Sequence, residues 1–164
     1  MYKKILVPLD GSRFGNRALK YAVDLAQKYQ ASVLLTQVIQ PTRPVPPVDP
    51  TGLTSPVASE ITFEQAADAD RRNLSRAKRY LAGKVRELKA KGIAAEYRAV
   101  EGDAARDIIL VARKNKADLI VMTTHGRSGF RRAIMGSVAD KVIRESGEPV
   151  LVVRPYQRRR RHHK

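Results

Sequence analysis

The stretch that decides the fold of this chain reads Met122-Thr-Thr-His-Gly126-Arg-Ser-Gly129-Phe-Arg-Arg-Ala-Ile-Met-Gly136-Ser137-Val138. Residues 118–122, which lead into it, are mostly apolar and predict a buried strand. A helical pattern begins at Gly136-Ser137 and stops at Gly147, and residues 150–153 predict a second buried strand. A strand, a glycine-containing loop and a helix in this order are typical of phosphate sites in parallel α/β sheets.

The glycines and the serine of this stretch suit an anion site. Gly126, Gly129 and Gly136 lack Cβ, so the backbone there can turn sharply and approach a ligand closely. A helix N-terminus carries unpaired N–H groups and a partial positive charge, and Ser137 adds a hydroxyl beside them. On spacing alone, a phosphate site and a plain surface loop with a capping serine are equally well supported.

The same stretch resembles the nucleotide-binding signature of the universal stress protein family. That signature is Gly, two residues, Gly, nine residues, Gly, then Ser or Thr, and Gly126, Gly136 and Ser137 match its last three fixed positions. Its first glycine falls on Thr123, a β-branched residue that restricts the backbone. The resemblance implies ATP binding. The departure at Thr123 leaves open a second hypothesis, an interaction protein that has lost useful affinity for ATP.

Strand patterns alternate with helical patterns along the whole chain. Five strands are predicted, at residues 3–9, 31–39, 93–100, 117–122 and 150–153. Four helices are predicted, beginning near Ser12, Thr62, Asp103 and Ser137. Right-handed crossovers turn this alternation into an α/β fold with a doubly wound parallel sheet. The resemblance covers residues 3–154 and implies the strand order 3-2-1-4-5, with helices on both faces.

Asp10 ends the first predicted strand, which is where open parallel sheets bind ligands. Alone it is an ordinary turn residue, but beside the loop at Gly126 it suits a ribose, a base amine or a metal ion. The resemblance assigns Pro8 and Asp10 to the adenosine and Val38 to the adenine, although Val38 is equally well explained as a core residue. Mg²⁺ is expected with ATP because it bridges phosphate oxygens. The predicted nucleotide-binding residues are Pro8, Asp10, Val38, Met122, Thr123, Gly126, Gly129, Gly136, Ser137 and Val138.

The sequence contains no clear catalytic machinery. We find no nucleophile with a general base beside it, and no lysine of the Walker type follows the glycines. His125 is more simply a loop residue that points at solvent than a group that titrates near a phosphate. We therefore expect a regulatory ATP-binding protein rather than an enzyme, with slow hydrolysis left open.

Composition excludes several classes of function and suggests another. The chain has no Cys, which excludes disulfides and thiolate chemistry and favours a reducing cytoplasm. It has no Trp and few aromatic residues, which argues against stacking platforms for single-stranded nucleic acid. The net charge of +16 is concentrated in residues 71–91 and in the tail at 158–164. Such a field attracts polyanions, so a binder of nucleic acid or of an anionic surface is a third hypothesis, although a solvated helix face and a disordered tail are the simpler explanation.

The length of 164 residues suits one domain, and no stretch is long enough to span a membrane. We expect a nucleotide-binding domain at residues 1–155 and a basic disordered tail at 156–164. A proline-rich loop insertion is predicted at residues 40–60, where six prolines stand. The apolar strand at 150–153 is expected to be an edge, which invites pairing with a second chain. Relatives in the family commonly dimerise through this strand, so a homodimer is predicted.

Overall fold

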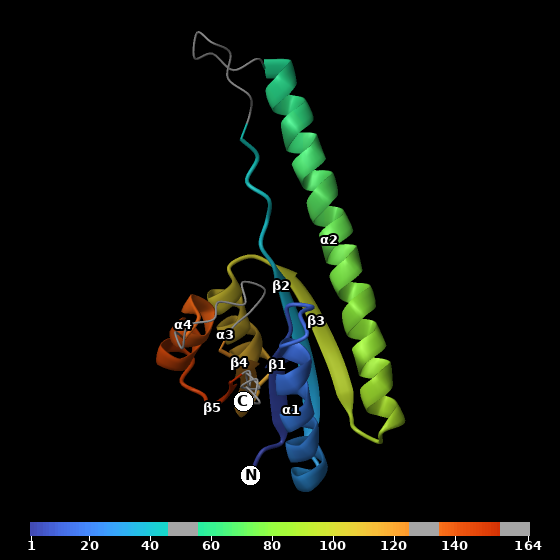
Figure 1. The fold of residues 1–164 in the computed structure, drawn as a ribbon, viewed down its shortest axis with the longest axis vertical. Coiled ribbons are helices and arrows are strands. Elements are labelled where there is room, and N and C mark those ends of the chain that lie inside the picture. Colours follow the sequence, from blue (N-terminus) through green and yellow to red (C-terminus); the bar gives the residue numbers. More distant parts are fainter. Residues whose placement is uncertain (46–55, 125–134, 155–164) are drawn as a thin grey trace, which may run out of the picture.

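The computed structural model describes residues 1–45, 56–124 and 135–154, and it confirms the predicted alternation of strands and helices (Figure 1). Its strands are β1 Lys4–Pro8, β2 Ser32–Ile39, β3 Ala95–Glu101, β4 Leu119–Thr123 and β5 Val150–Val153. Its helices are α1 Gly15–Tyr29, α2 Pro56–Ala90, α3 Ala104–Lys114 and α4 Ser137–Glu145. None of the helices in this described part of the chain is both long and apolar enough to cross a membrane.

The five strands form one parallel sheet in the order β3-β2-β1-β4-β5. The predicted α/β fold and its strand order 3-2-1-4-5 are therefore confirmed. Strand β1 lies at the centre and pairs with β4 through Ile5 opposite Leu119 and Leu6 opposite Ile120. Strands β3 and β5 are the two edges. The strand order reverses between β1 and β4, so their carboxyl ends flank the place where a crevice forms in such sheets.

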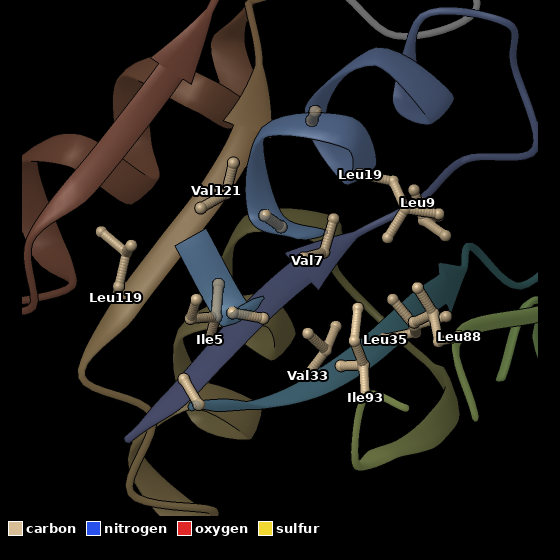
Figure 2. Packing of buried hydrophobic residues seen from close by; sticks show 14 of the residues in the cluster. Ile5, Val7, Leu9, Leu19, Val33, Leu35, Leu88, Ile93, Leu119 and Val121 are labelled. Atoms are coloured by element: carbon tan, nitrogen blue, oxygen red, sulfur yellow. The ribbon is translucent and has the colours of Figure 1, made fainter. Parts of the chain in front are cut away.

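Each face of the sheet carries its own hydrophobic core. Because successive side chains of a strand point to opposite faces, Ile5 and Val7 of β1 pack under α1 and α2, whereas Leu6 packs under α3 and α4. Figure 2 shows the first of these cores, in which Val33 and Leu35 of β2 join the side chains of β1. Burial on both faces explains why the strands read as nearly continuous apolar runs.

Two of the predicted helix starts can be compared with the observed caps. Asp103 is the N-cap of α3, as predicted, and its carboxylate accepts a hydrogen bond from the Arg106 N–H at 2.9 Å. At α1 the cap position is Phe14 rather than Ser12. The hydroxyl of Ser12 still accepts a hydrogen bond from the N–H of Gly15, the first helical residue, at 3.3 Å. The prediction that the Ser12 side chain bonds to the start of this helix is therefore correct. The predicted cap position is wrong by two residues.

The predicted start of α2 at Thr62 is wrong, because the helix begins at Pro56. Proline lacks an N–H and has a fixed φ, so it disrupts a helix interior but suits the first helical position. Counting every proline of residues 40–60 as evidence for a loop therefore extended the loop too far. The helix includes its last five residues, 56–60, and residues 46–55 lie outside the described part of the chain.

Candidate functional site

A cleft of about 270 Å³ opens at the carboxyl ends of β1 and β4. It is bounded by the strand ends on one side and by the starts of α3 and α4 on the other. Its walls are mainly apolar, with a few hydroxyl groups and one carboxylate among them. The described residues that line it are Pro8, Leu9, Asp10, Thr36, Val38, Ala104, Ile108, Met122, Thr123, Thr124, Gly136, Ser137, Val138 and Ala139.

Most of the residues predicted from the sequence meet in this cleft. They come from three strand ends and one helix start, although they are far apart in the chain. The ones that line it are Pro8, Asp10, Val38, Met122, Thr123, Gly136, Ser137 and Val138. The other two, Gly126 and Gly129, lie outside the described residues, as do His125 and the basic tail at 156–164.

The N-terminus of α4 faces the cleft without a side-chain cap. Its N-cap is Gly136, in an extended conformation with φ −65° and ψ 146°, and among the described residues no side chain caps the helix. The first backbone bond of the helix runs from the Asp140 N–H to the Gly136 carbonyl at 3.0 Å. The N–H groups of residues 137–139 precede that bond and have no acceptor within the helix. Since these residues line the cleft, the positive end of α4 is available to an anion.

Gly136 is required by a close backbone contact. Its N–H donates to the carbonyl oxygen of Thr124 at 2.8 Å, and a Cβ at this position would lie 2.6 Å from that same oxygen. The contact joins the end of β4 to the start of α4. The close approach of the Thr124 carbonyl thus explains why this motif position is a glycine. The close approach of a phosphate is not needed to explain it.

Asp10 has a structural role as well as a place in the cleft. One of its carboxylate oxygens accepts a hydrogen bond from the Ser12 N–H at 2.9 Å, which closes the turn between β1 and α1. Gly15 follows closely, and a Cβ there would lie 3.3 Å from the same carboxylate oxygen. Asp10 is therefore a turn residue, and it also lies at the cleft.

Sequence reasoning missed several residues of the cleft. Ala104 and Ile108 of α3 line it, because the crossover from β3 to β4 brings the start of α3 over the carboxyl ends of the central strands. Thr36 of β2 is fully buried and donates a hydrogen bond to the Arg98 carbonyl at 3.0 Å. The available signal was the turn at Gly102-Asp103, which ends a strand and precedes α3. The missed lining residues are Leu9, Thr36, Ala104, Ile108, Thr124 and Ala139.

Comparison with known proteins places the chain beside one family. The model of the universal stress protein family matches residues 1–154. Universal stress protein MJ0531 of Methanocaldococcus jannaschii is 34% identical over 155 residues, covering 94% of this chain and 83% of that relative. Among solved structures, protein MJ0577 superposes with a TM-score of 0.78 at 26% identity, covering 96% of this chain and 99% of that one.

Two other solved structures with this fold contain nucleotides. A universal stress protein in complex with cAMP is 24% identical, covers 93% of this chain and 97% of its own, and has a TM-score of 0.57. The universal stress protein of Archaeoglobus fulgidus in complex with dAMP is 20% identical, covers 92% and 97%, and has a TM-score of 0.56. At these identities the likeness establishes the shared fold.

Proposed function

This chain belongs to the universal stress protein family, and we propose that it binds ATP in the cleft at the carboxyl ends of β1 and β4. The observation that carries the proposal is the N-terminus of α4, which opens into this cleft with a glycine in place of a capping side chain. The phosphates accept hydrogen bonds from the first N–H groups of α4 and from the hydroxyl of Ser137.

The rest of the lining suits an adenosine. Val38 and Met122 offer apolar surface to the base, and Asp10 offers a carboxylate to a ribose hydroxyl. The cAMP and dAMP complexes of relatives with the same fold support an adenine nucleotide as the class of ligand. Thr123 lines the cleft at the end of β4, and a glycine there would have no side chain to occupy this space.

Mg²⁺ is proposed to arrive with the nucleotide. The described residues include no group of three His, Asp or Glu side chains placed to hold a metal ion by themselves. Asp10 is the carboxylate among the described lining residues, which fits the way Mg²⁺ binds through substrate phosphates, one carboxylate and waters. When bound, the ion would neutralise phosphate charge.

We propose that the protein acts as a nucleotide-responsive regulatory module rather than an enzyme. The described lining residues include no Lys, His or Cys, and the Asp10 carboxylate already accepts a bond from its own turn. A homodimer through the edge strand β5 belongs to the same proposal, because three of its four residues are only partly buried. Residence in the cytoplasm is likewise proposed, from the absence of Cys.

The test is a calorimetric titration with Mg-ATP at about 0.15 M salt, where the loose attraction of a basic surface is screened. The key variant is Ser137→Pro, which removes one N–H and the hydroxyl. Proline is favoured at the first position of a helix, and the extended φ and ψ of Gly136 suit a residue before proline. We expect saturable binding near one ATP per chain, weakened about 10- to 100-fold in Ser137→Pro by the loss of a charge-assisted hydrogen bond.

Ser137→Ala is the matched control, since it removes the hydroxyl and keeps the N–H. It should fall between the wild type and Ser137→Pro. Equal affinities of the wild type and Ser137→Pro would remove the α4 N-terminus from the site. If the wild type does not bind ATP and the Thr123→Gly variant does, the alternative is favoured. The protein would then be an interaction protein in which Thr123 has disabled ATP binding.

A further inference from the structure

Helix α2 extends well past the sheet that it covers (Figure 1). The inner face of its C-terminal half is buried against the sheet through four residues at helical spacing, Ala77, Leu81, Val85 and Leu88. Further towards the N-terminus, the Asp70 carboxylate accepts bonds from the N–H of Thr42 at 3.0 Å and from its hydroxyl at 2.7 Å. The inner side of the projecting half is thus tied to the segment after β2, and the opposite side faces solvent.

Charge is divided along this helix into two blocks. Residues 60–70 contain four acidic residues and no Lys or Arg, whereas residues 71–91 contain nine Lys or Arg and one Glu. Solvated helices usually mix the two signs along one face. A separation of this kind gives one helix an acidic end and a basic end, which can meet in a second copy that runs the opposite way.

Three of the four acidic residues lie on one exposed flank of the helix, whereas Asp70 contacts Thr42 on the inner side. Glu60, Glu64 and Asp68 follow one another at spacings of four, so they form one row, and all three are exposed. Asp68 also pairs with Arg71 within the helix. Ile61 lies next to this row and is 50% exposed, which adds apolar surface at the same end.

The row continues into the basic block at spacings of three and four. It passes Arg71 and Ser75, and then Lys78, Ala82 and Arg86; all are exposed except Ala82, which is half-buried. The two small residues, Ser75 and Ala82, therefore stand between the basic residues of this row. We call the full row from Glu60 to Arg86 the outer face of α2.

We propose that the outer face of α2 is a self-association surface, on which a second copy of this chain lies antiparallel. A two-fold axis midway between Arg71 and Ser75 brings the outer face onto itself, so that each contact occurs twice. Glu60 then lies opposite the partner's Arg86, and Asp68 lies opposite the partner's Lys78. The small residues complete the register, with Arg71 opposite the partner's Ser75 and Glu64 opposite the partner's Ala82, so no like charges face each other.

The direction of pairing follows from the same charges. A parallel pair would place the acidic block on the acidic block and the basic block on the basic block, which is repulsive along the whole contact. The antiparallel pair also sets the two helix dipoles in opposition, which is favourable. Because the contacts are exposed ion pairs, the association is weak, concentration-dependent and sensitive to salt.

The geometry can be tested by cross-linking, since the full chain has no Cys of its own. Ser75→Cys is compared with Ala82→Cys, using a bis-maleimide of about 10 Å reach. With a rise of about 1.5 Å per residue, the two copies of position 75 are offset by about 6 Å along the axis, and those of position 82 by about 27 Å. We expect a linked dimer from Ser75→Cys alone. Links at both positions would indicate a parallel pair, and links at neither would refute the contact.

The chemistry can be tested by sedimentation of charge-reversed chains at about 0.05 M salt. Glu60→Lys with Asp68→Lys makes the outer face basic, and Lys78→Glu with Arg86→Glu makes it acidic. Each double variant alone should lose at least about tenfold in self-association, and an equimolar mixture should recover it as a heterodimer. Raising the salt to about 0.5 M should weaken the wild-type contact similarly.

Arg72→Glu with Arg76→Glu is the matched control. It changes the net charge of α2 by the same amount as the acidic variant, but both residues are exposed and lie beside the outer face, not in it. It should keep clearly more association than the acidic variant does. Loss of association in this control, or a mixture that fails to recover it, would overturn the proposal in favour of a general charge effect. A dimer through β5 would respond to none of these substitutions.

Discussion

Helices α3 and α4 both begin near the carboxyl ends of the strands and both border the cleft, but their N-termini are built differently. In α3 the N-cap is Asp103, whose carboxylate accepts a hydrogen bond from the third residue of the helix. In α4 the N-cap is Gly136, which has no side chain to offer. The first helix caps one of its N–H groups with its own side chain, and the second begins at the cleft without such a cap. The difference indicates which of the two helix ends is available to a ligand.

The largest effect is expected from Gly136→Ala, which tests whether α4 needs its glycine for the backbone contact. The added Cβ would lie 2.6 Å from the Thr124 carbonyl oxygen, so β4 and α4 must separate. We expect the free energy of unfolding, measured with urea, to fall by about 1–3 kcal/mol. Gly83→Ala is the control, because a Cβ there meets only the end of the Arg86 side chain at 4.0 Å. It lies inside α2 and should stabilise by about 0.5–1 kcal/mol. A Gly136→Ala protein as stable as the wild type would contradict this account.

An intermediate effect is expected from Asp103→Ala, which removes the cap of α3. Loss of a capping carboxylate typically lowers the free energy of unfolding by about 0.5–2 kcal/mol. Ser137→Ala, at the uncapped helix, should change it by less than about 0.5 kcal/mol, because that hydroxyl caps nothing. The order reverses for ATP affinity, which Ser137→Ala should weaken more than Asp103→Ala. Equal stability losses in both variants would remove the distinction between the two helix ends.

The smallest effect is expected beside a third helix end, that of α1. There the Tyr80 hydroxyl of α2 donates to Asn16 in the first turn of α1 at 3.4 Å. Burial raises the pKa of Tyr80 above its ordinary value, and the charges of Asp10 and Glu87 act in the same direction, while Lys84 opposes them. Since the folded state favours the protonated phenol, its contribution to stability is present below pH ~10 and is lost as the pH rises through the folded pKa.

Tyr80→Phe should therefore show a smaller fall in stability between about pH 9 and pH 11 than the wild type. The measurement is urea unfolding across this range, in which the other tyrosines contribute equally to both proteins. Identical pH profiles would mean that the α1–α2 contact does not sense the ionisation of Tyr80.

Much of this molecule follows from local patterns in the chain. Apolar runs of strand length alternate with helical periodicity, and this alternation is sufficient for a parallel α/β sheet, because right-handed crossovers leave few other arrangements. Asp10 was identified because ligands bind beyond the carboxyl ends of parallel strands. The meeting of β1 and β4, and the roles of Pro8 and Val38, came from the resemblance to the universal stress protein family. Asp103 was recognisable as a cap because an Asp after a glycine, just before a helical pattern, has a local hydrogen bond to make.

Other features depended on contacts between distant segments. The start of α2 at Pro56 was missed because a proline marks either a loop or a first helical turn. Ala104 and Ile108 have no chemical signature, and they border the cleft only because α3 crosses over the central strands.

The sequence by itself determined the class of the fold, the edge of the sheet that can bind a ligand and the division of charge along α2, because each of these is a property of short stretches. Only the tertiary structure decided why Gly136 must be a glycine, since the Thr124 carbonyl lies 2.6 Å from where its Cβ would stand. It also decided which side of α2 remains exposed, because that depends on which residues the sheet covers. Distances between residues remote in the chain are set by packing, and no local pattern encodes them.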